Sequence, residues 1–127
     1  MARFEPKKYG GGSDTSPTAQ ENRVASRLGG KRVVGSGASM FSKADVRSVK
    51  ANIGSESLEF LVECKQTIHK SLSIKWDWLK KISAEADAQQ CEPALTIEIK
   101  GGESDALTDR DWVLLPARVF RKLKDGE

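Results

Sequence analysis

A glutamate and a lysine close a largely apolar, strand-like segment, residues 58–65 (LEFLVECK). Alternate residues of a strand project from the same face, so Glu63 and Lys65 are expected to lie side by side. Asp45 stands earlier in the chain, at the start of another strand-like segment. Carboxylates beside an ammonium group can hold a hard divalent cation, polarise a phosphate and activate water. The pattern therefore predicts the chemistry of phosphodiester hydrolysis.

Asp45 and Glu63 are the candidate ligands of one Mg²⁺, for which Mn²⁺ is expected to substitute, and the main-chain carbonyl of Cys64 could add a third ligand. Two carboxylates are sufficient because Mg²⁺ usually keeps several waters. Lys65 would orient the attacking water or stabilise the charge of the transition state. Glu21, on an earlier helical segment, would ligate a second metal or hold a metal-bound water.

The same residues also allow a structural interpretation. A Glu-x-Lys pair on a strand is usually a solvent-exposed ion pair worth less than about 1 kcal/mol. Here, however, the pair continues a strand that is apolar on both faces, where ionised groups are rare unless they are paired or bind metal. Two hypotheses stay open: a catalytic site, and a non-catalytic DNA-binding module whose carboxylates form structural ion pairs.

The composition bounds the class of protein. A chain of 127 residues fits one domain, and a net charge of +3 permits nucleic-acid binding without requiring it. Cys64 and Cys91 form neither a disulfide framework nor a zinc motif. The chain has no run of about 18 apolar residues and no apolar signal-peptide core near its start. We expect an intracellular, cytoplasmic protein with no membrane partner.

Local patterns predict the order helix, strand, strand, strand, helix, strand, strand, helix. Ser16 and Pro17 mark the start of the first helix and Gly29 its end, and Ser73 is expected to cap the second. The expected helices cover residues 17–28, a long segment after 73, and 117–123; the expected strands cover 31–34, 44–50, 58–65, 94–99 and 112–115. A long helix between two strands indicates a parallel crossover. The predicted fold is therefore α/β, a mixed central β-sheet flanked by helices, over residues 16–127, preceded by a flexible polar tail, residues 1–15.

Four stretches of the chain carry a family resemblance. The first three contain, in order, a glutamate, an aspartate and a Glu-x-Lys motif. The four stretches are residues 21–38 (ENRVASRLGGKRVVGSGA), 43–46 (KADV), 61–67 (LVECKQT) and 71–86 (SLSIKWDWLKKISAEA). The chain resembles the PD-(D/E)xK nuclease superfamily and, more narrowly, the small Holliday-junction resolvases of phages and archaea. The likeness extends over residues 17–99, and Ala44 stands where the motif has proline. The loss of that proline weakens the match more than the chemistry, since proline only shapes the backbone before the acid.

The resemblance implies a restriction-endonuclease-like fold and a Mg²⁺-dependent, structure-selective endodeoxyribonuclease of DNA recombination. Such an enzyme cuts branched DNA at four-way junctions, usually as a homodimer, and phages encode proteins of this kind. Asp45 and Glu63 match the metal ligands, Lys65 the catalytic lysine and Glu21 the helix glutamate. The alternative within the superfamily is a repair or site-specific DNA nuclease, which would read mismatches or bases.

Residues around the acidic centre are expected to form a rim that binds DNA phosphates without reading sequence. The expected DNA-binding residues are Lys31, Arg32, Ser36, Gly37, Lys43, Thr67 and Lys70. Lys75, Lys80 and Lys81 are instead expected to be solvated charges of the second helix. Trp78 belongs to the predicted core stripe of that helix, and Trp76 is expected in the core or a dimer interface rather than stacked on a base.

Overall fold

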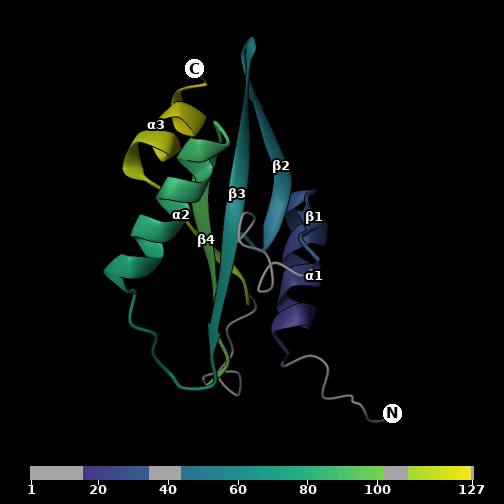
Figure 1. Ribbon diagram of the computed structural model, residues 1–127, viewed down its shortest axis with the longest axis vertical. Helices are drawn as coiled ribbons and strands as arrows, with labels where there is room; N and C mark the ends of the chain where they lie inside the picture. The colour runs from purple at the N-terminus through teal and green to yellow at the C-terminus, as the bar shows by residue number, and fades with distance from the viewer. Residues whose placement is uncertain (1–15, 35–43, 102–108, 127) are drawn as a thin grey trace.

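The structure is a computed structural model that describes residues 16–34, 44–101 and 109–126 (Figure 1). Its elements follow the predicted order: α1 (Pro17–Leu28), β1 (Lys31–Arg32), β2 (Val46–Ile53), β3 (Glu56–Thr67), α2 (Trp76–Ala88), β4 (Glu92–Ile99), β5 (Trp112–Leu114) and α3 (Ala117–Asp125). The predicted tail, residues 1–15, lies outside the described residues, and so do Ser36, Gly37 and Lys43.

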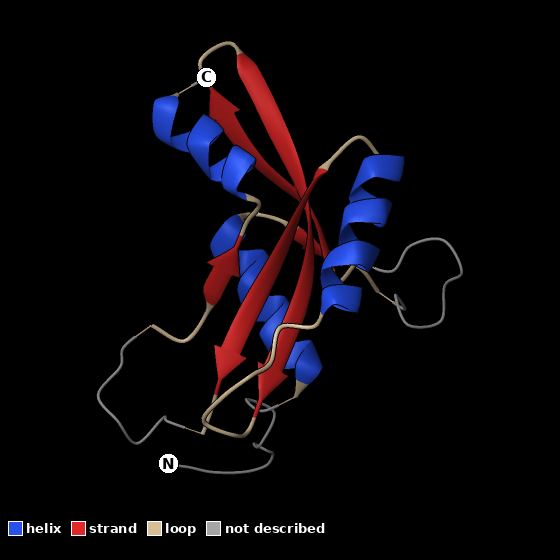
Figure 2. Ribbon diagram, turned by 90° about the vertical axis from the view of Figure 1, so that its left-hand side faces the viewer, coloured by secondary structure: helices blue, strands red, loops and turns tan. Residues whose placement is uncertain are grey.

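The strands form one mixed sheet in the order β1-β2-β3-β4-β5, with helices on both sides (Figure 2). Neighbouring strands are antiparallel except for β3 and β4, which run parallel. The helix α2 connects these two strands and forms the expected crossover. The α/β class and the central position of β3 are therefore confirmed, and β3 holds the residues of chemical interest in the middle of the sheet.

The helix ends test the capping predictions. The Ser16 hydroxyl accepts a hydrogen bond from the Ala19 N–H at 3.0 Å, and Gly29 closes α1 in the left-handed conformation at φ 73°. For α2 the prediction was wrong, because the N-cap is the extended Lys75, not Ser73, and its side chain makes no capping hydrogen bond. Asp77 in the first turn provides negative charge at this N-terminus instead.

Among the described residues, no helix combines the length and the apolar composition that crossing a bilayer requires.

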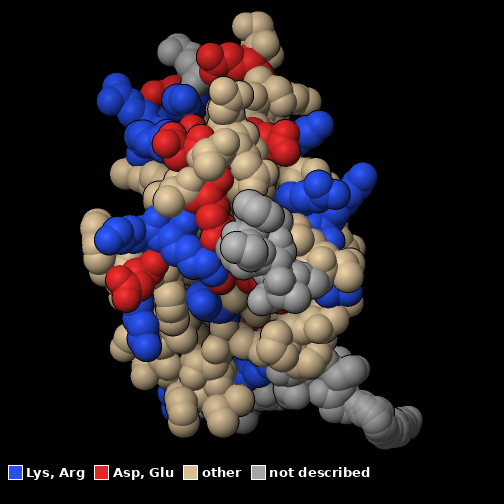
Figure 3. Space-filling view, in the orientation of Figure 1, with Lys and Arg blue, Asp and Glu red and all other residues tan. Residues whose placement is uncertain are grey.

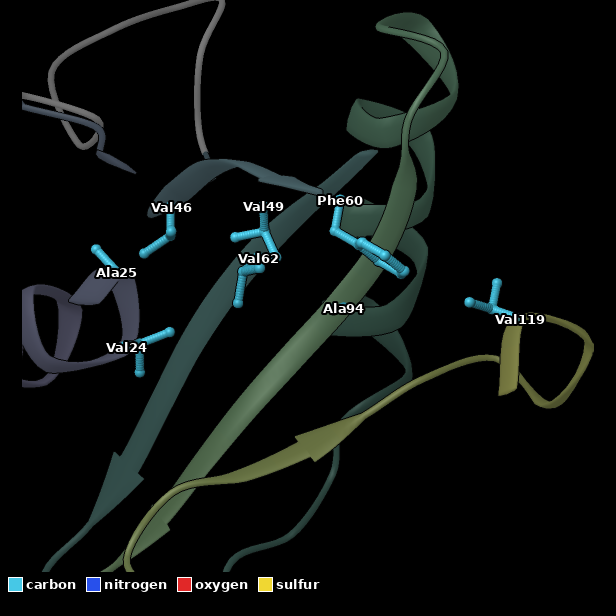
Figure 4. Close-up of a cluster of buried hydrophobic side chains, with 8 residues drawn as sticks. All are labelled: Val24, Ala25, Val46, Val49, Phe60, Val62, Ala94 and Val119. Carbon is cyan, nitrogen blue, oxygen red and sulfur yellow. The ribbon is translucent and has the colours of Figure 1, made fainter. Parts of the chain in front are cut away.

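Two hydrophobic clusters fill the space between the sheet and the helices. The first joins α1 and α3 to the sheet and contains Val24, Ala25, Val46, Val49, Phe60, Val62, Ala94 and Val119 (Figure 4). The second lies against α2 and contains Ala44, Leu61, Ile82, Ala86 and Leu95. Phe60 and Val62 pack in the first cluster while Leu61 packs in the second, so β3 is buried on both faces, as its composition indicates.

A network of ion pairs around the buried carboxylate of Glu98 attaches α1 to β4 and to the segment before β5. The carboxylate of Glu98 on β4, whose side chain is 1% exposed, lies 2.9 Å from Arg23 of α1 and 3.9 Å from Lys100, and it also pairs with Arg110. Arg23 in turn donates two hydrogen bonds to Asp111, at 2.7 and 2.9 Å. Ion pairs away from water persist only when well partnered, so this network fixes how α1 lies on the sheet.

Candidate active site

β3 places Glu63 and Lys65 side by side on the face that α2 covers. Lys65 Nζ lies 3.5 Å from Glu63 Oε2, and Lys81 Nζ of α2 lies 3.9 Å from the same oxygen. The side chain of Glu63 is 10% exposed and that of Lys65 is 26% exposed. The structure thus brings the predicted carboxylate and ammonium together in a partly sheltered position.

Asp45 reaches the same part of β3 from the start of β2. Its backbone N–H donates to the Val62 carbonyl at 3.0 Å, and its Oδ2 accepts a hydrogen bond from the Cys64 N–H at 2.8 Å. The register of β2 against β3 shifts just beyond this point, where Ser48 adopts φ 63°. The carboxylate of Asp45 is therefore anchored to the backbone that carries Glu63.

The electrostatics of the site show that three predicted carboxylates interact. Burial raises the pKa of Glu63, and the negative charge of Asp45 raises it further, against the opposing effects of Lys81 and Lys65. Burial likewise raises the pKa of Glu21, as do the charge of Asp45 and a side-chain hydrogen bond with it, while Arg32 opposes them. A cluster of like charges favours a bound proton or cation.

The fit of a divalent cation can be judged from the polar atoms of the site. Glu63 Oε1 is buried and has no hydrogen-bond partner within the described part of the chain. Those residues contain no group of three or more His, Cys, Asp or Glu side chains arranged as metal ligands. Mg²⁺ usually takes only one or two protein carboxylates and keeps waters, so the carboxylates of Asp45 and Glu63 are compatible in number and chemistry with such an ion. The role of the Cys64 carbonyl stays a prediction.

Cys64 itself is unsuited to act as a nucleophile. Burial raises the pKa of its thiol to about 12, and the negative charges of Asp45, Glu21 and Glu63 add to the effect. The thiolate is the nucleophilic form of cysteine, and it is scarce at neutral pH in this environment. The groups of this region that can take part in chemistry at neutral pH are therefore its carboxylates and amines rather than the thiol.

One polar residue that the sequence analysis overlooked supports the site from α1. Gln20 is 1% exposed, and its Nε2 donates to the backbone carbonyl of Lys65 at 2.8 Å. Gln20 and the buried Val24 are four residues apart and share one helix face, a signal that the sequence carries. Gln20 therefore ties α1 to the end of β3 that presents Lys65.

Three residues of α2 differ from expectation or add to it. The ring of Trp78 is partly buried in the second cluster, as predicted, but its centroid also lies 4.6 Å from Lys65 Nζ, within cation–π distance. Lys81 is an ion-pair partner of Glu63 rather than only a solvated charge, because its charge partner lies on the strand that α2 packs against. Trp76 is 73% exposed, which excludes the core as its place, and the dimer interface, the other role expected for it, stays a prediction.

The expected DNA-binding residues surround the site only in part. Lys31 and Lys70 are exposed, whereas Arg32 lies 3.7 Å from Glu21 and so belongs to the carboxylate cluster. The Thr67 hydroxyl, at the end of β3, accepts a hydrogen bond from the His69 N–H at 3.1 Å. Figure 3 shows acidic side chains along the middle of one face with basic side chains on either side. Among the described residues, Arg32 lies beside Glu21, and Lys65 and Lys81 lie beside Glu63, so basic groups border these carboxylates.

Comparison of the chain with protein-family models, with curated proteins and with solved structures finds no match. The class of protein has to be inferred from the residues themselves. They form an α/β domain in which Asp45, just before β2, is bound to the backbone of β3 and acts electrostatically on Glu63, which pairs with Lys65, while Glu21 interacts with Asp45.

Proposed function

We propose that the protein is a metal-dependent endonuclease of the PD-(D/E)xK superfamily that resolves Holliday junctions. The observation that supports this most strongly is the meeting of three side chains. Asp45 is held by the Cys64 N–H, Glu63 presents a buried oxygen without a hydrogen-bond partner among the described residues, and Lys65 lies 3.5 Å from Glu63. The mixed sheet that carries them supports a restriction-endonuclease-like fold as part of the same proposal.

In this proposal Asp45 and Glu63 hold one Mg²⁺, or Mn²⁺ in its place, and the Cys64 carbonyl and Glu21 are further candidate ligands. When bound, the ion polarises the scissile phosphate and acidifies a water. Lys65, placed between Glu63 and the ring of Trp78, provides positive charge where the phosphate gains negative charge, or orients the water. The raised pKa values of Glu21 and Glu63 are consistent with a site built to receive positive charge.

The proposed substrate is branched DNA, and the proposed place of action is the cytoplasm. Exposed Lys31 and Lys70 can bind phosphates without reading bases, which suits an enzyme that recognises the shape of a junction. A four-way junction is nearly two-fold symmetric, so a homodimer with one site per protomer would cut it in pairs. Trp76, exposed on α2, is available for the contact between protomers.

A cleavage assay tests the proposal. The wild-type protein should cut a synthetic four-way junction in Mg²⁺ and not in EDTA, and should cut linear duplex of the same sequence much more slowly. Asp45→Asn should abolish cleavage while leaving junction binding in place. Asp87→Asn, at an exposed position of α2, is the matched control and should cut normally.

Other outcomes would redirect or refute the proposal. Equal rates on linear duplex would indicate another nuclease of the same superfamily. Full activity of Asp45→Asn, or activity in EDTA, would refute the proposed site. Junction binding without any metal-dependent cleavage would indicate the non-catalytic module.

A further inference from the structure

Lys81 lies between two carboxylates, one on the sheet and one on its own helix. Its Nζ is 3.9 Å from Glu63 Oε2 on β3 and 3.9 Å from Glu85 Oε2, one turn further along α2. The carboxylates are well covered, with side chains 10% and 14% exposed, whereas the Lys81 side chain is 52% exposed. One mobile ammonium group therefore serves two sheltered acids.

The distances show that Lys81 is tightly bound to neither acid. Hydrogen bonds between N–H donors and oxygen acceptors span about 2.7–3.2 Å, so both contacts are ion pairs without a close hydrogen bond. The lysine side chain is a flexible stem with a point charge, and a small rotation carries it towards either partner. Glu85 thus offers Lys81 a second position that does not involve the metal site.

The two ammonium groups beside Glu63, those of Lys65 and Lys81, differ in their second partner. Lys65 faces the ring of Trp78 at 4.6 Å, which holds its charge near the site. Lys81 has the alternative partner Glu85 instead. A divalent cation bound to Glu63 would repel an ammonium group about 4 Å away. Among the ion pairs of the described residues, Lys81 has a second acid to which it can withdraw and Lys65 does not.

We propose that Lys81 is an exchangeable counter-ion of the metal site, which neutralises Glu63 in the metal-free protein and withdraws to Glu85 when a divalent cation binds. The inference rests on the proposed function, since it assumes a metal at Glu63. Lys81 then competes with the metal, and Glu85 relieves that competition. The two residues should therefore affect metal affinity in opposite directions.

Metal affinity, measured without DNA, tests the inference. Mn²⁺ is titrated into the full-length protein by calorimetry and by melting temperature. Lys81→Met should bind Mn²⁺ about two- to fivefold more tightly, the range that a partly exposed ion pair of about 0.4–1 kcal/mol supports. Glu85→Gln should bind it more weakly by a similar factor, because Lys81 then stays on Glu63. Lys81→Arg keeps the charge and should resemble the wild type, as should the exposed control Lys80→Met.

The double variant separates exchange from a general effect of charge. If Glu85 acts through Lys81, Glu85→Gln should change Mn²⁺ affinity little once Lys81→Met is present. Equal or weaker binding by Lys81→Met, or the same loss from Glu85→Gln with and without Lys81, would overturn the inference while leaving the proposed function intact. Absence of Mn²⁺ binding by the wild type, or unchanged binding by Asp45→Asn, would overturn both.

Discussion

Replacing Gln20 with leucine tests how far α1 supports the site. Leucine is similar in size to glutamine but cannot donate a hydrogen bond to the Lys65 carbonyl. In the wild-type protein this carbonyl accepts a hydrogen bond from Gln20 Nε2 at 2.8 Å. A hydrogen bond of this kind contributes about 0.5–1.5 kcal/mol. For a chain of this length, 1 kcal/mol lowers the melting temperature by about 4 °C, so Gln20→Leu should lower it by about 2–6 °C.

The same change should affect cleavage through the position of Lys65. Gln20 makes no contact with the Lys65 ammonium, only with its backbone, so it is a positioning residue. A displaced catalytic group can cost about 10–100-fold in rate, and the loss should fall on kcat rather than on KM. Gln20→Met, which removes the donor but keeps a side chain of similar length without adding charge, should show the same loss.

Calorimetry in EDTA and single-turnover cleavage of a four-way junction measure the two effects. Asn22→Leu, at an exposed position of the same helix, is the control and should change stability by no more than about 0.5 kcal/mol. A Gln20→Leu protein that melts within 1–2 °C of the wild type, a shift of about 0.5 kcal/mol or less, and cuts at the wild-type rate would refute the reasoning.

Three further predictions follow from the contacts of the site and the network. Glu98→Gln removes the buried negative charge that pairs with Arg23, Arg110 and Lys100, so it should cost about 3–5 kcal/mol of unfolding free energy by denaturant titration; a loss under about 1 kcal/mol would contradict it. Folding raises the pKa of Glu63, so the stabilising contribution of the protonated Glu63 is fully present below its unfolded pKa and is lost as pH rises through its folded pKa. In EDTA, the melting temperature of Glu63→Gln should therefore rise relative to that of the wild type between pH 4 and pH 7. A difference between the two melting temperatures that stays constant over this range would be inconsistent with the argument. Trp78→Leu should slow cleavage about fivefold or more by releasing Lys65, and Trp78→Phe should restore much of the rate, whereas equal rates for both would indicate packing alone.

The parts of the fold that local chemistry determines could be predicted from the sequence. Ser16, Pro17 and Gly29 bound α1 because capping and left-handed glycine are local preferences. The apolar segment of β3 indicated a central strand because burial on both faces requires it. The prediction that Ser73 caps α2 was wrong because a residue with a capping side chain acts as an N-cap only if it directly precedes the first turn, and α2 begins after Lys75.

In the candidate site, too, the sequence predicts what local patterns determine but not the contacts between separate elements. Asp45, Glu63 and Lys65 could be predicted because residue type and strand alternation are visible in the sequence. The partners Gln20, Trp78 and Lys81 depend on how two helices lie across the sheet, so spacing within a helix shows which face is used but not which strand residue it meets.

The central claim is that Asp45 and Glu63 share one divalent cation beside Lys65. Anomalous diffraction from crystals soaked in Mn²⁺ tests it most directly. We expect one peak coordinated by both carboxylates, with the Lys65 ammonium next to it, and loss of the peak in Asp45→Asn. A peak on other residues, or carboxylates that point apart with no ion between them, would contradict the proposed active site.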